Sequence, residues 1–174
     1  MMHNQVVNSE FDPPDYRKYK DIVLLHDAYS RLRYKMRTRK RDLPCHLNLD
    51  DTVEEIKFKQ PADTYELIDI GEQMSICVAA YDERVISRQC SIVVGYEKNI
   101  PVICLELSSA LSLRQAKGVR NQHLDNNKLN AAIKWCHTRN IEYKNCRDLE
   151  DKQLEITNII RELEGQSLAH CYFE

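Results

Sequence analysis

Four carboxylates near the middle of the chain have the residue type needed for acid–base or glycosyl-transfer chemistry. They are Asp69, Asp82, Glu83 and Glu97. A carboxylate held in a cleft can accept or donate a proton, or attack a sugar carbon as a nucleophile. Carboxylates at the ends of helices and loops are more often ordinary surface residues. The four are therefore candidates, and their use depends on which of them the fold places in a cleft.

A second cluster is basic and dense, with seven cations in the eleven residues from 31 to 41. Its members are Arg31, Arg33, Lys35, Arg37, Arg39, Lys40 and Arg41. Such a cluster could bind a polyanion, nucleic acid or an anionic membrane, and each phosphate contact would be sensitive to salt. Apolar residues recur at helical spacing over 27–41, which predicts a helix whose cations face the solvent.

Three adjacent Cys–His pairs suggest a metal site but do not have the spacing of one. They are Cys45–His46, Cys136–His137 and His170–Cys171. Structural zinc sites separate paired ligands by two to four residues, and adjacent side chains rarely point at one ion. The chain also has four glycines and no P-loop or GxGxxG turn. We therefore predict no metal site and no bound cofactor.

Length and composition favour one ordinary globular domain. The chain has 174 residues and a net charge of −2, which gives no overall attraction to nucleic acid or membrane. No apolar run is long enough to span a bilayer, and no signal peptide is visible at the N-terminus. Seven cysteines, an odd number, do not form a complete disulfide framework. These features predict reduced thiols and a cytoplasmic protein.

The carboxylates surround a central stretch, Met74–Leu107, which we expect to organise the fold. It holds two short apolar runs, Ile76–Tyr81 and Val102–Leu107, separated by a mixed segment over 85–98. Short apolar runs are typical of strands buried on both faces. A connection of about 20 residues between them favours a βαβ unit with parallel strands.

The remaining pattern predicts an α/β fold, a flavodoxin-like five-stranded parallel sheet with helices on both faces. Further strands are expected over 21–26, 43–49 and 141–143, and helices over 64–73, 126–138 and 148–165, the last ending at Gly165. Residues 50–63 and 108–125 are expected to be loops. The expected organisation is a flexible arm over 1–19, a domain over 20–165 and a tail over 166–174.

The order of elements and the sequence Ser87-Arg88-Gln89-Cys90 resemble the Toll/interleukin-1 receptor (TIR) domain family. The opening DIVLLHDAY and the charged loop ending at Pro61 agree with that family more loosely. Where the NAD-cleaving members carry a catalytic Glu, this chain has Val93. The resemblance therefore implies an adaptor that assembles with other TIR-like domains, or with itself, and does no chemistry.

Two segments are expected to contact partners under this interpretation, the loop Thr52–Asp63 and the segment Asp82–Cys90. In the loop, Phe58 and Pro61 would form an apolar anchor inside a polar rim. The rim residues are Glu54, Glu55, Lys57 and Lys59. In the second segment the expected contact residues are Asp82, Ser87, Arg88 and Cys90. For Phe58, the competing interpretation is that its side chain packs back onto the domain.

A weaker resemblance is to nucleoside 2-deoxyribosyltransferases. It rests on Gly95, Tyr96 and the spacing to Pro101, with Asp69 near that family's accessory Asp. The position of that family's nucleophilic Glu is again Val93. The expected function is thus a non-catalytic protein–protein interaction or signalling module. The alternatives are an N-glycosyl hydrolase or transferase that uses Glu97 or Asp69, and a polyanion binder that uses the basic cluster.

Overall fold

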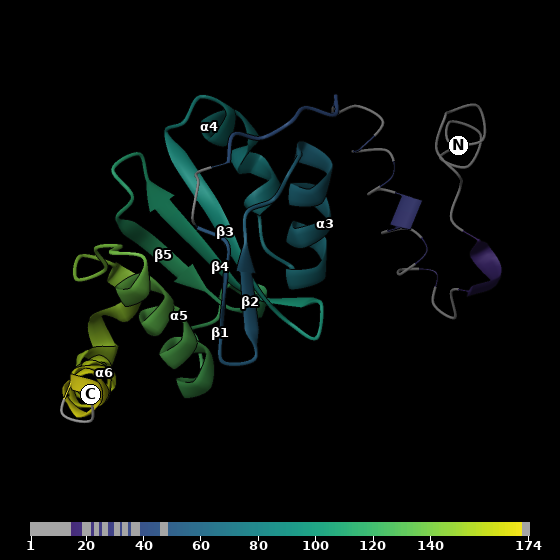
Figure 1. The fold of residues 1–174 in the computed structure, drawn as a ribbon. Coiled ribbons are helices and arrows are strands. Elements are labelled where there is room, and N and C mark those ends of the chain that lie inside the picture. Colours follow the sequence, from purple (N-terminus) through teal and green to yellow (C-terminus); the bar gives the residue numbers. More distant parts are fainter. Residues whose placement is uncertain are drawn as a thin grey trace.

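The fold is built on a five-stranded antiparallel sheet, whose strands lie in the order in which they occur in the chain (Figure 1). The structure is a computed structural model, and it describes residues 15–18, 22, 25, 28, 29, 32, 35, 39–45 and 49–171, with side chains up to Glu164. The strands are β1 (Asp51–Val53), β2 (Ile56–Lys59), β3 (Cys90–Glu97), β4 (Ile100–Ser108) and β5 (Leu113–Lys117). Every neighbouring pair is antiparallel. The predicted parallel, flavodoxin-like sheet is therefore wrong.

A tight turn between β3 and β4 explains why the two strands are antiparallel. Its two central residues, Lys98 and Asn99, have φ angles of 49° and 66°. Two consecutive residues with positive φ make the turn that matches the twist of a two-residue hairpin. The segment expected to be a crossover helix is therefore β3 itself, which pairs with β4 along most of its length.

Other expected elements also change. Residues 76–81, expected to be a strand, instead contain a 3-10 helix, η2 (Val78–Tyr81). The short helix α4 (Asp82–Ile86) follows it directly. The loop expected over 50–63 contains the β1–β2 hairpin, and the loop expected over 108–125 contains β5 and the 3-10 turn η3 (Val119–Asn121). The strand expected over 141–143 is reduced to one parallel bridge between Ser112 and Glu142.

Two helices follow the prediction closely because each begins at a capping aspartate. α3 spans Thr64–Met74, and the Asp63 side chain accepts hydrogen bonds from the backbone N–H groups of Tyr65 and Glu66. α5 spans Asn126–Thr138, and the Asp125 side chain accepts from the N–H of Lys128. The last helix, α6 (Gln153–Cys171), follows the 3-10 segment η4 (Arg147–Lys152). It continues past Gly165 into the expected tail, so the predicted end at that residue is wrong.

The N-terminal part is described only in places. The 3-10 turn η1 covers Tyr16–Lys18. Ile22 and Leu25 are helical, so the strand expected over 21–26 is wrong at these two positions. The described positions 28, 29, 32 and 35 are helical, as expected, whereas residues 39–41 are not, so the helix expected over 27–41 is wrong at its end. Residues 43–45 and 49 are not in a strand, although one was expected over 43–49, and Asp42 makes a single bridge to Asp63.

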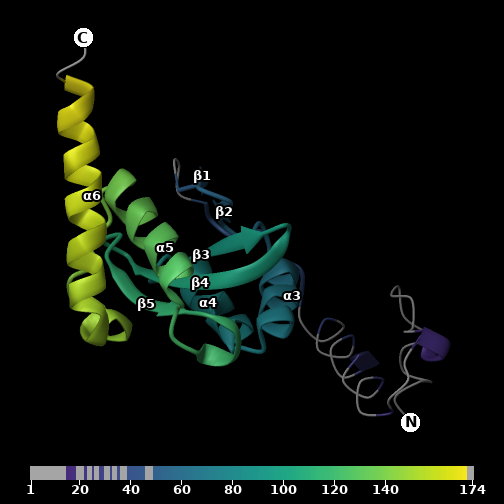
Figure 2. The same ribbon diagram turned by 90° about the horizontal axis from the view of Figure 1, so that it is seen from below.

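Helices cover both faces of the sheet, and Figure 2 shows α5 and α6 on one side and α3 on the other. Successive side chains of a strand point to opposite faces, so β3 contributes to two cores. Val93 packs with Leu105, Leu107 and residues of α5 and α6. Ile92 and Val94 pack with residues of α3, η2 and α4. Burial on both faces explains why β3 and β4 have the apolar runs more typical of parallel strands. No helix in the described residues is long and apolar enough to cross a membrane.

Candidate functional site

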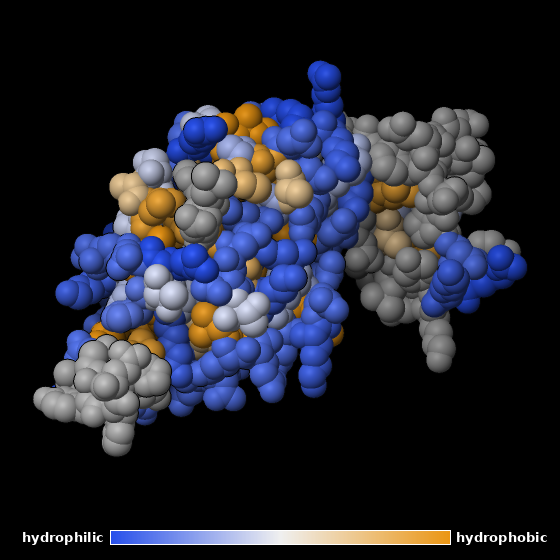
Figure 3. All heavy atoms as spheres, viewed as in Figure 1, coloured by the Kyte–Doolittle hydropathy of each residue, from blue (hydrophilic) through white to orange (hydrophobic). Residues whose placement is uncertain are grey.

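A cavity of about 80 Å3 lies on the α4 side of the sheet, between η2 and the strands β3, β4 and β5. Its apolar lining comes from Ile76, Cys77, Val78, Tyr81, Ile92 and Cys104, and its polar lining from Glu106, Gln115, Lys117 and Asn121. Figure 3 shows a mostly hydrophilic face with apolar side chains gathered over its upper part, where α4 lies in Figure 1. The cavity thus combines an apolar wall with a few polar groups, as small binding sites do.

The main polar group of the cavity is Glu106, whose side chain is only 6% exposed. In β4 it lies between Leu105 and Leu107, which point to the opposite face and are fully buried. The guanidinium of Arg84 in α4 donates from Nη2 to Glu106 Oε1 at 2.7 Å. A carboxylate buried this deeply needs such a partner, because desolvation of an unpaired charge is very costly.

Arg84 is itself held in place by a second contact. Its guanidinium carbon lies 4.7 Å from the centre of the Tyr81 ring, a cation–π geometry. Burial alone would lower the pKa of Arg84, but the hydrogen bond and charge of Glu106 raise it above its ordinary value. Arg84 is therefore cationic at neutral pH and is held between Glu106 and Tyr81.

The second carboxylate oxygen of Glu106 remains available to the cavity. Within the described part of the chain, Arg84 is the one side chain that donates to Glu106, and it does so at Oε1. Glu106 also lines the cavity. Oε2 is consequently a charged hydrogen-bond acceptor that a bound group can reach.

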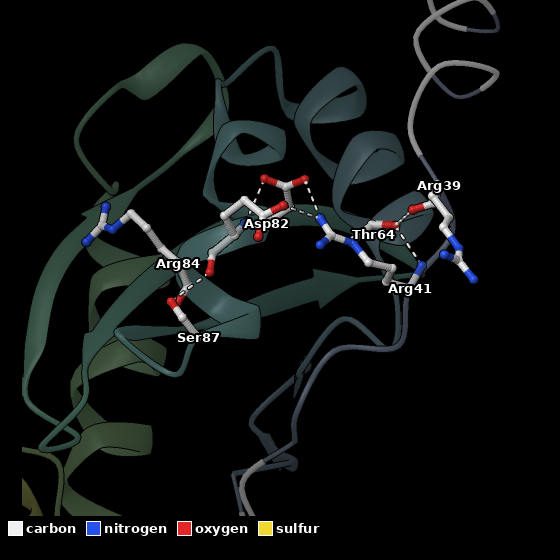
Figure 4. Close-up of polar contacts among 7 residues, drawn as sticks. Arg39, Arg41, Thr64, Asp82, Arg84 and Ser87 are labelled. Carbon is white, nitrogen blue, oxygen red and sulfur yellow. Dashed lines mark hydrogen bonds and ion pairs between the residues drawn. The ribbon is translucent and has the colours of Figure 1, made fainter.

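The other charged residues of α4 connect it to the segment that precedes α3 (Figure 4). Arg41 Nη2 lies 2.7 Å from Glu83 Oε1 and 3.4 Å from Asp82 Oδ2. Thr64 Oγ1 donates to the carbonyl of Arg39 and accepts from the N–H of Arg41, both at 3.2 Å. One short helix therefore joins the N-terminal segment to the wall of the cavity, since its next residue, Arg84, binds Glu106.

The expected interaction loop is a hairpin whose apolar residues are not exposed. Phe58 is fully buried and Pro61 is buried, so the predicted apolar anchor is wrong and the competing interpretation of Phe58 is correct. Glu54 Oε1 pairs with Lys134 Nζ at 2.6 Å. Lys59 lies over the Tyr96 ring at 4.5 Å, and Lys57 is exposed.

The expected contact segment Asp82–Cys90 follows Tyr81, which lines the cavity, and contains Arg84, which binds Glu106. Ser87, Arg88 and Gln89 are exposed in the turn that follows α4. The Ser87 hydroxyl donates to the carbonyl of Glu83 at 2.7 Å. Cys90 is buried, and burial raises the pKa of its thiol, so it is not a surface contact residue.

Asp69 and Glu97, the two carboxylates expected to act in an enzyme, are not brought together. Asp69 in α3 pairs with Lys35. Glu97 is exposed at the end of β3 and lines a separate pocket of about 270 Å3, to which Asp69 does not contribute. Val93, the position of the missing Glu in both suspected families, is fully buried. No group of three or more metal-ligating side chains occurs among the described residues.

The described members of the basic cluster are largely neutralised within the chain. Lys35 is paired with Asp69 and its side chain is only 20% exposed, so the prediction that it faces solvent is wrong. Lys40 pairs with Asp63 at 3.1 Å, Arg41 with α4 as above, and Arg39 is exposed. Arg31, Arg33 and Arg37 lie outside the described residues.

The sequence interpretation missed Glu106 and Arg84. The available signal was a single acidic residue inside an otherwise apolar run, ICLEL, since a charge in a buried strand needs a partner. The partner could not be identified from the sequence, because Arg84 approaches β4 only through the hairpin that was not predicted.

Comparison with known proteins identifies a different family from those suspected. A family model described as PcfJ-like protein matches residues 1–133, so the chain belongs to the PcfJ-like family. The resemblances to TIR domains and to nucleoside 2-deoxyribosyltransferases are therefore wrong. No curated protein and no solved structure matches the chain.

Proposed function

We propose that this PcfJ-like protein is a non-catalytic protein-binding module whose partner contacts α4, the turn after it and the adjoining cavity. The observation that carries the proposal is Glu106, a buried carboxylate with one oxygen held by Arg84 and the other available to the cavity. Buried charged groups beside a cavity are candidates for functional sites, because the fold gains little from them alone.

The energetic cost of the buried pair supports a binding role. A buried ion pair adds little stability, and apolar residues of similar volume often do as well or better in its place. The Arg84–Glu106 pair nevertheless has a fixed geometry, since the guanidinium of Arg84 stacks on the Tyr81 ring. A preorganised polar group reduces the cost of ordering on binding.

Two features favour binding over chemistry at this site. Burial raises the pKa of the Cys104 thiol to about 12, so the thiol is protonated and not nucleophilic at neutral pH. Glu106 is fixed by a permanent cation rather than by a group that exchanges protons. In the turn after α4, Ser87, Arg88 and Gln89 offer exposed polar contacts for the rim of an interface.

The proposal also includes the cellular compartment of the protein. Six cysteines of the described residues are free thiols: Cys45, Cys77, Cys90, Cys104, Cys136 and Cys146. Free thiols in this number fit a reducing compartment, and we place the protein in the cytoplasm.

Site-specific photo-cross-linking in cells tests the proposal. A photo-reactive amino acid at Gln89, exposed in the turn after α4, should yield one defined cross-linked protein, identifiable by mass spectrometry. The same group at Lys144, an exposed residue between α5 and η4, is the matched control and should not yield it. Equal capture from both positions, or none from Gln89, would contradict the proposed surface.

A double variant separates binding from folding. Arg84→Met with Glu106→Leu removes the ion pair and keeps similar volume, so the melting temperature should stay the same or rise. Cross-linking from Gln89 should nevertheless be lost. A variant that still captures the partner at the wild-type level would show that the pair serves no binding role.

A further inference from the structure

The charges around the cavity cancel in pairs. Glu106 is neutralised by Arg84, and Lys117 by Asp148, whose carboxylate also accepts the backbone N–H of Ala116 at 3.0 Å. A cation entering the cavity would meet two cations that are already in place, and an anion would meet the free oxygen of Glu106. The balance therefore favours an uncharged group.

The hydrogen-bonding capacity of the cavity is more specific. Glu106 Oε2 belongs to a carboxylate that binds a guanidinium, and such an oxygen accepts hydrogen bonds. The side-chain amides of Gln115 and Asn121 can both donate and accept, and both residues are exposed at the cavity edge. A bound group must therefore supply a donor to Glu106, and it can supply an acceptor to either amide.

The size of the cavity limits what can enter. Its volume of about 80 Å3 is below the roughly 150 Å3 of a cavity that holds benzene, and it equals a few water molecules. A nucleotide is far too large, whereas the tip of one side chain fits. Ile76, Val78 and Ile92 give the stem of that side chain an apolar surface.

We infer that the cavity binds the tip of one uncharged side chain of the partner protein, a carboxamide or hydroxyl that donates a hydrogen bond to Glu106 Oε2. The inference rests on the proposed function, because it names what the partner inserts. It assigns Glu106 as the residue that determines specificity, and Arg84 as the residue that positions it.

Three small probes with the same ring and different charge test this chemistry on the full chain, because the head group of each has the size of a side-chain tip and can enter the cavity while the ring stays at its mouth. Benzamide is neutral and donates, benzamidinium is cationic, and benzoate is anionic. Two-dimensional NMR should show benzamide shifting the backbone signals of Gln115 and Asn121 in a saturable manner. Benzoate has no donor and leaves Glu106 Oε2 unpaired, so it should bind at least about tenfold more weakly. Benzamidinium has no acceptor for Gln115 or Asn121 and adds a cation beside Lys117, so it should also bind at least about tenfold more weakly. Stronger binding of either charged probe would overturn the inference.

Variants locate the binding. Glu106→Gln replaces the charged acceptor with a neutral amide and should weaken benzamide about tenfold, in line with the greater strength of charge-assisted hydrogen bonds. Glu97→Gln makes the same change at an exposed carboxylate outside the cavity and should have no effect. If Glu106→Gln does not fold, Cys77→Phe narrows the mouth from an exposed position and should abolish the shifts. Unchanged benzamide binding in Cys77→Phe would place the probe elsewhere.

The probe experiment and the cross-linking experiment can fail separately. Benzamide binding without a cross-linked partner would leave the ligand chemistry intact and overturn the proposed protein partner. A partner captured from Gln89 with no benzamide binding would support the module and overturn the inference about the inserted side chain.

Discussion

The ring of Phe58 stacks on the ring of Trp135, with centroids 5.3 Å apart and planes 25° from parallel. Both side chains are fully buried, and the Trp135 indole N–H donates to the carbonyl of Leu49 at 3.0 Å. The contact joins β2, the strand between β1 and β3, to α5, because Phe58 lies in β2. The hairpin that contains Phe58 is therefore part of the core and not a free loop.

Replacing Phe58 tests this relationship directly. Phe58→Ala should lower the free energy of unfolding by about 3–5 kcal/mol, because it removes a buried ring and leaves a cavity beside Trp135. Lys57→Ala, one residue away in the same strand and exposed, should change it by less than about 0.5 kcal/mol. Urea unfolding of both variants gives the comparison. Equal effects would mean that the hairpin does not pack on α5.

Local signals predicted α3 and α5 correctly. Each helix begins at an aspartate that caps it, and each has apolar residues at helical spacing, so the information lies within about a dozen residues. α6 continues beyond Gly165, where the sequence pattern predicted its end. A glycine inside a helix costs only about 1 kcal/mol, so it does not have to end the helix.

The direction of the strands could not be obtained in the same way. An apolar run such as that of β4 indicates burial on both faces, and both parallel and helix-covered antiparallel sheets provide it. The decisive feature is two residues long, because Lys98 and Asn99 both have positive φ and form the hairpin turn. Lys-Asn is not one of the pairs, such as Asn-Gly or Asp-Gly, that mark this turn in a sequence. The Glu106 site depends on that hairpin, so an error in strand direction also concealed the site.

Gly95 provides a second test of the packing between β2, β3 and β4. A Cβ atom at this position would lie 2.9 Å from Cγ2 of Ile56 and 3.1 Å from Cε1 of Phe58. Gly95→Ala should therefore destabilise the protein by about 1–3 kcal/mol, as overpacking does. At Gly118 the nearest atom would be 3.4 Å away, so Gly118→Ala should be close to neutral. Thermal unfolding distinguishes the two, and a neutral Gly95→Ala would contradict the observed spacing.

Asp51 connects the start of β1 to the end of α5 and should contribute a pH-dependent stability. Its carboxylate pairs with Arg139 at 2.6 Å and accepts the N–H of Thr52 at 2.7 Å. The hydrogen bond from Arg139, together with that from Thr52, lowers the pKa of Asp51 below its ordinary 3.8. A lowered pKa stabilises the folded state above pH 3.8, and this stabilisation is lost as the pH falls through the folded pKa.

Asp51→Asn removes the charge and so removes this dependence. The variant should be less stable than the wild type by about 0.5 kcal/mol near pH 6, since the pair is partly exposed. The difference should shrink toward zero as the pH falls through the folded-state pKa of Asp51, because the wild-type carboxylate then becomes protonated. Urea unfolding at a series of pH values gives the difference directly. A difference that is constant with pH would mean that the Arg139 pair does not stabilise the fold.

The described cysteines should divide into two reactivity classes in the folded protein. Cys45 and Cys77 are exposed, whereas Cys90, Cys104, Cys136 and Cys146 are buried. Burial also raises the pKa of the Cys104 thiol to about 12 and that of the Cys146 thiol to about 11, which suppresses the reactive thiolate. Brief treatment with iodoacetamide at pH 7.5, followed by peptide mapping, should label Cys45 and Cys77 first. The buried four should react only after denaturation, at rates that follow global unfolding.

Adding benzamide before iodoacetamide should slow the labelling of Cys77, which lines the cavity, and leave the labelling of Cys45 unchanged. Early labelling of Cys104 would show that η2 opens readily, and the cavity would then not be a preformed site.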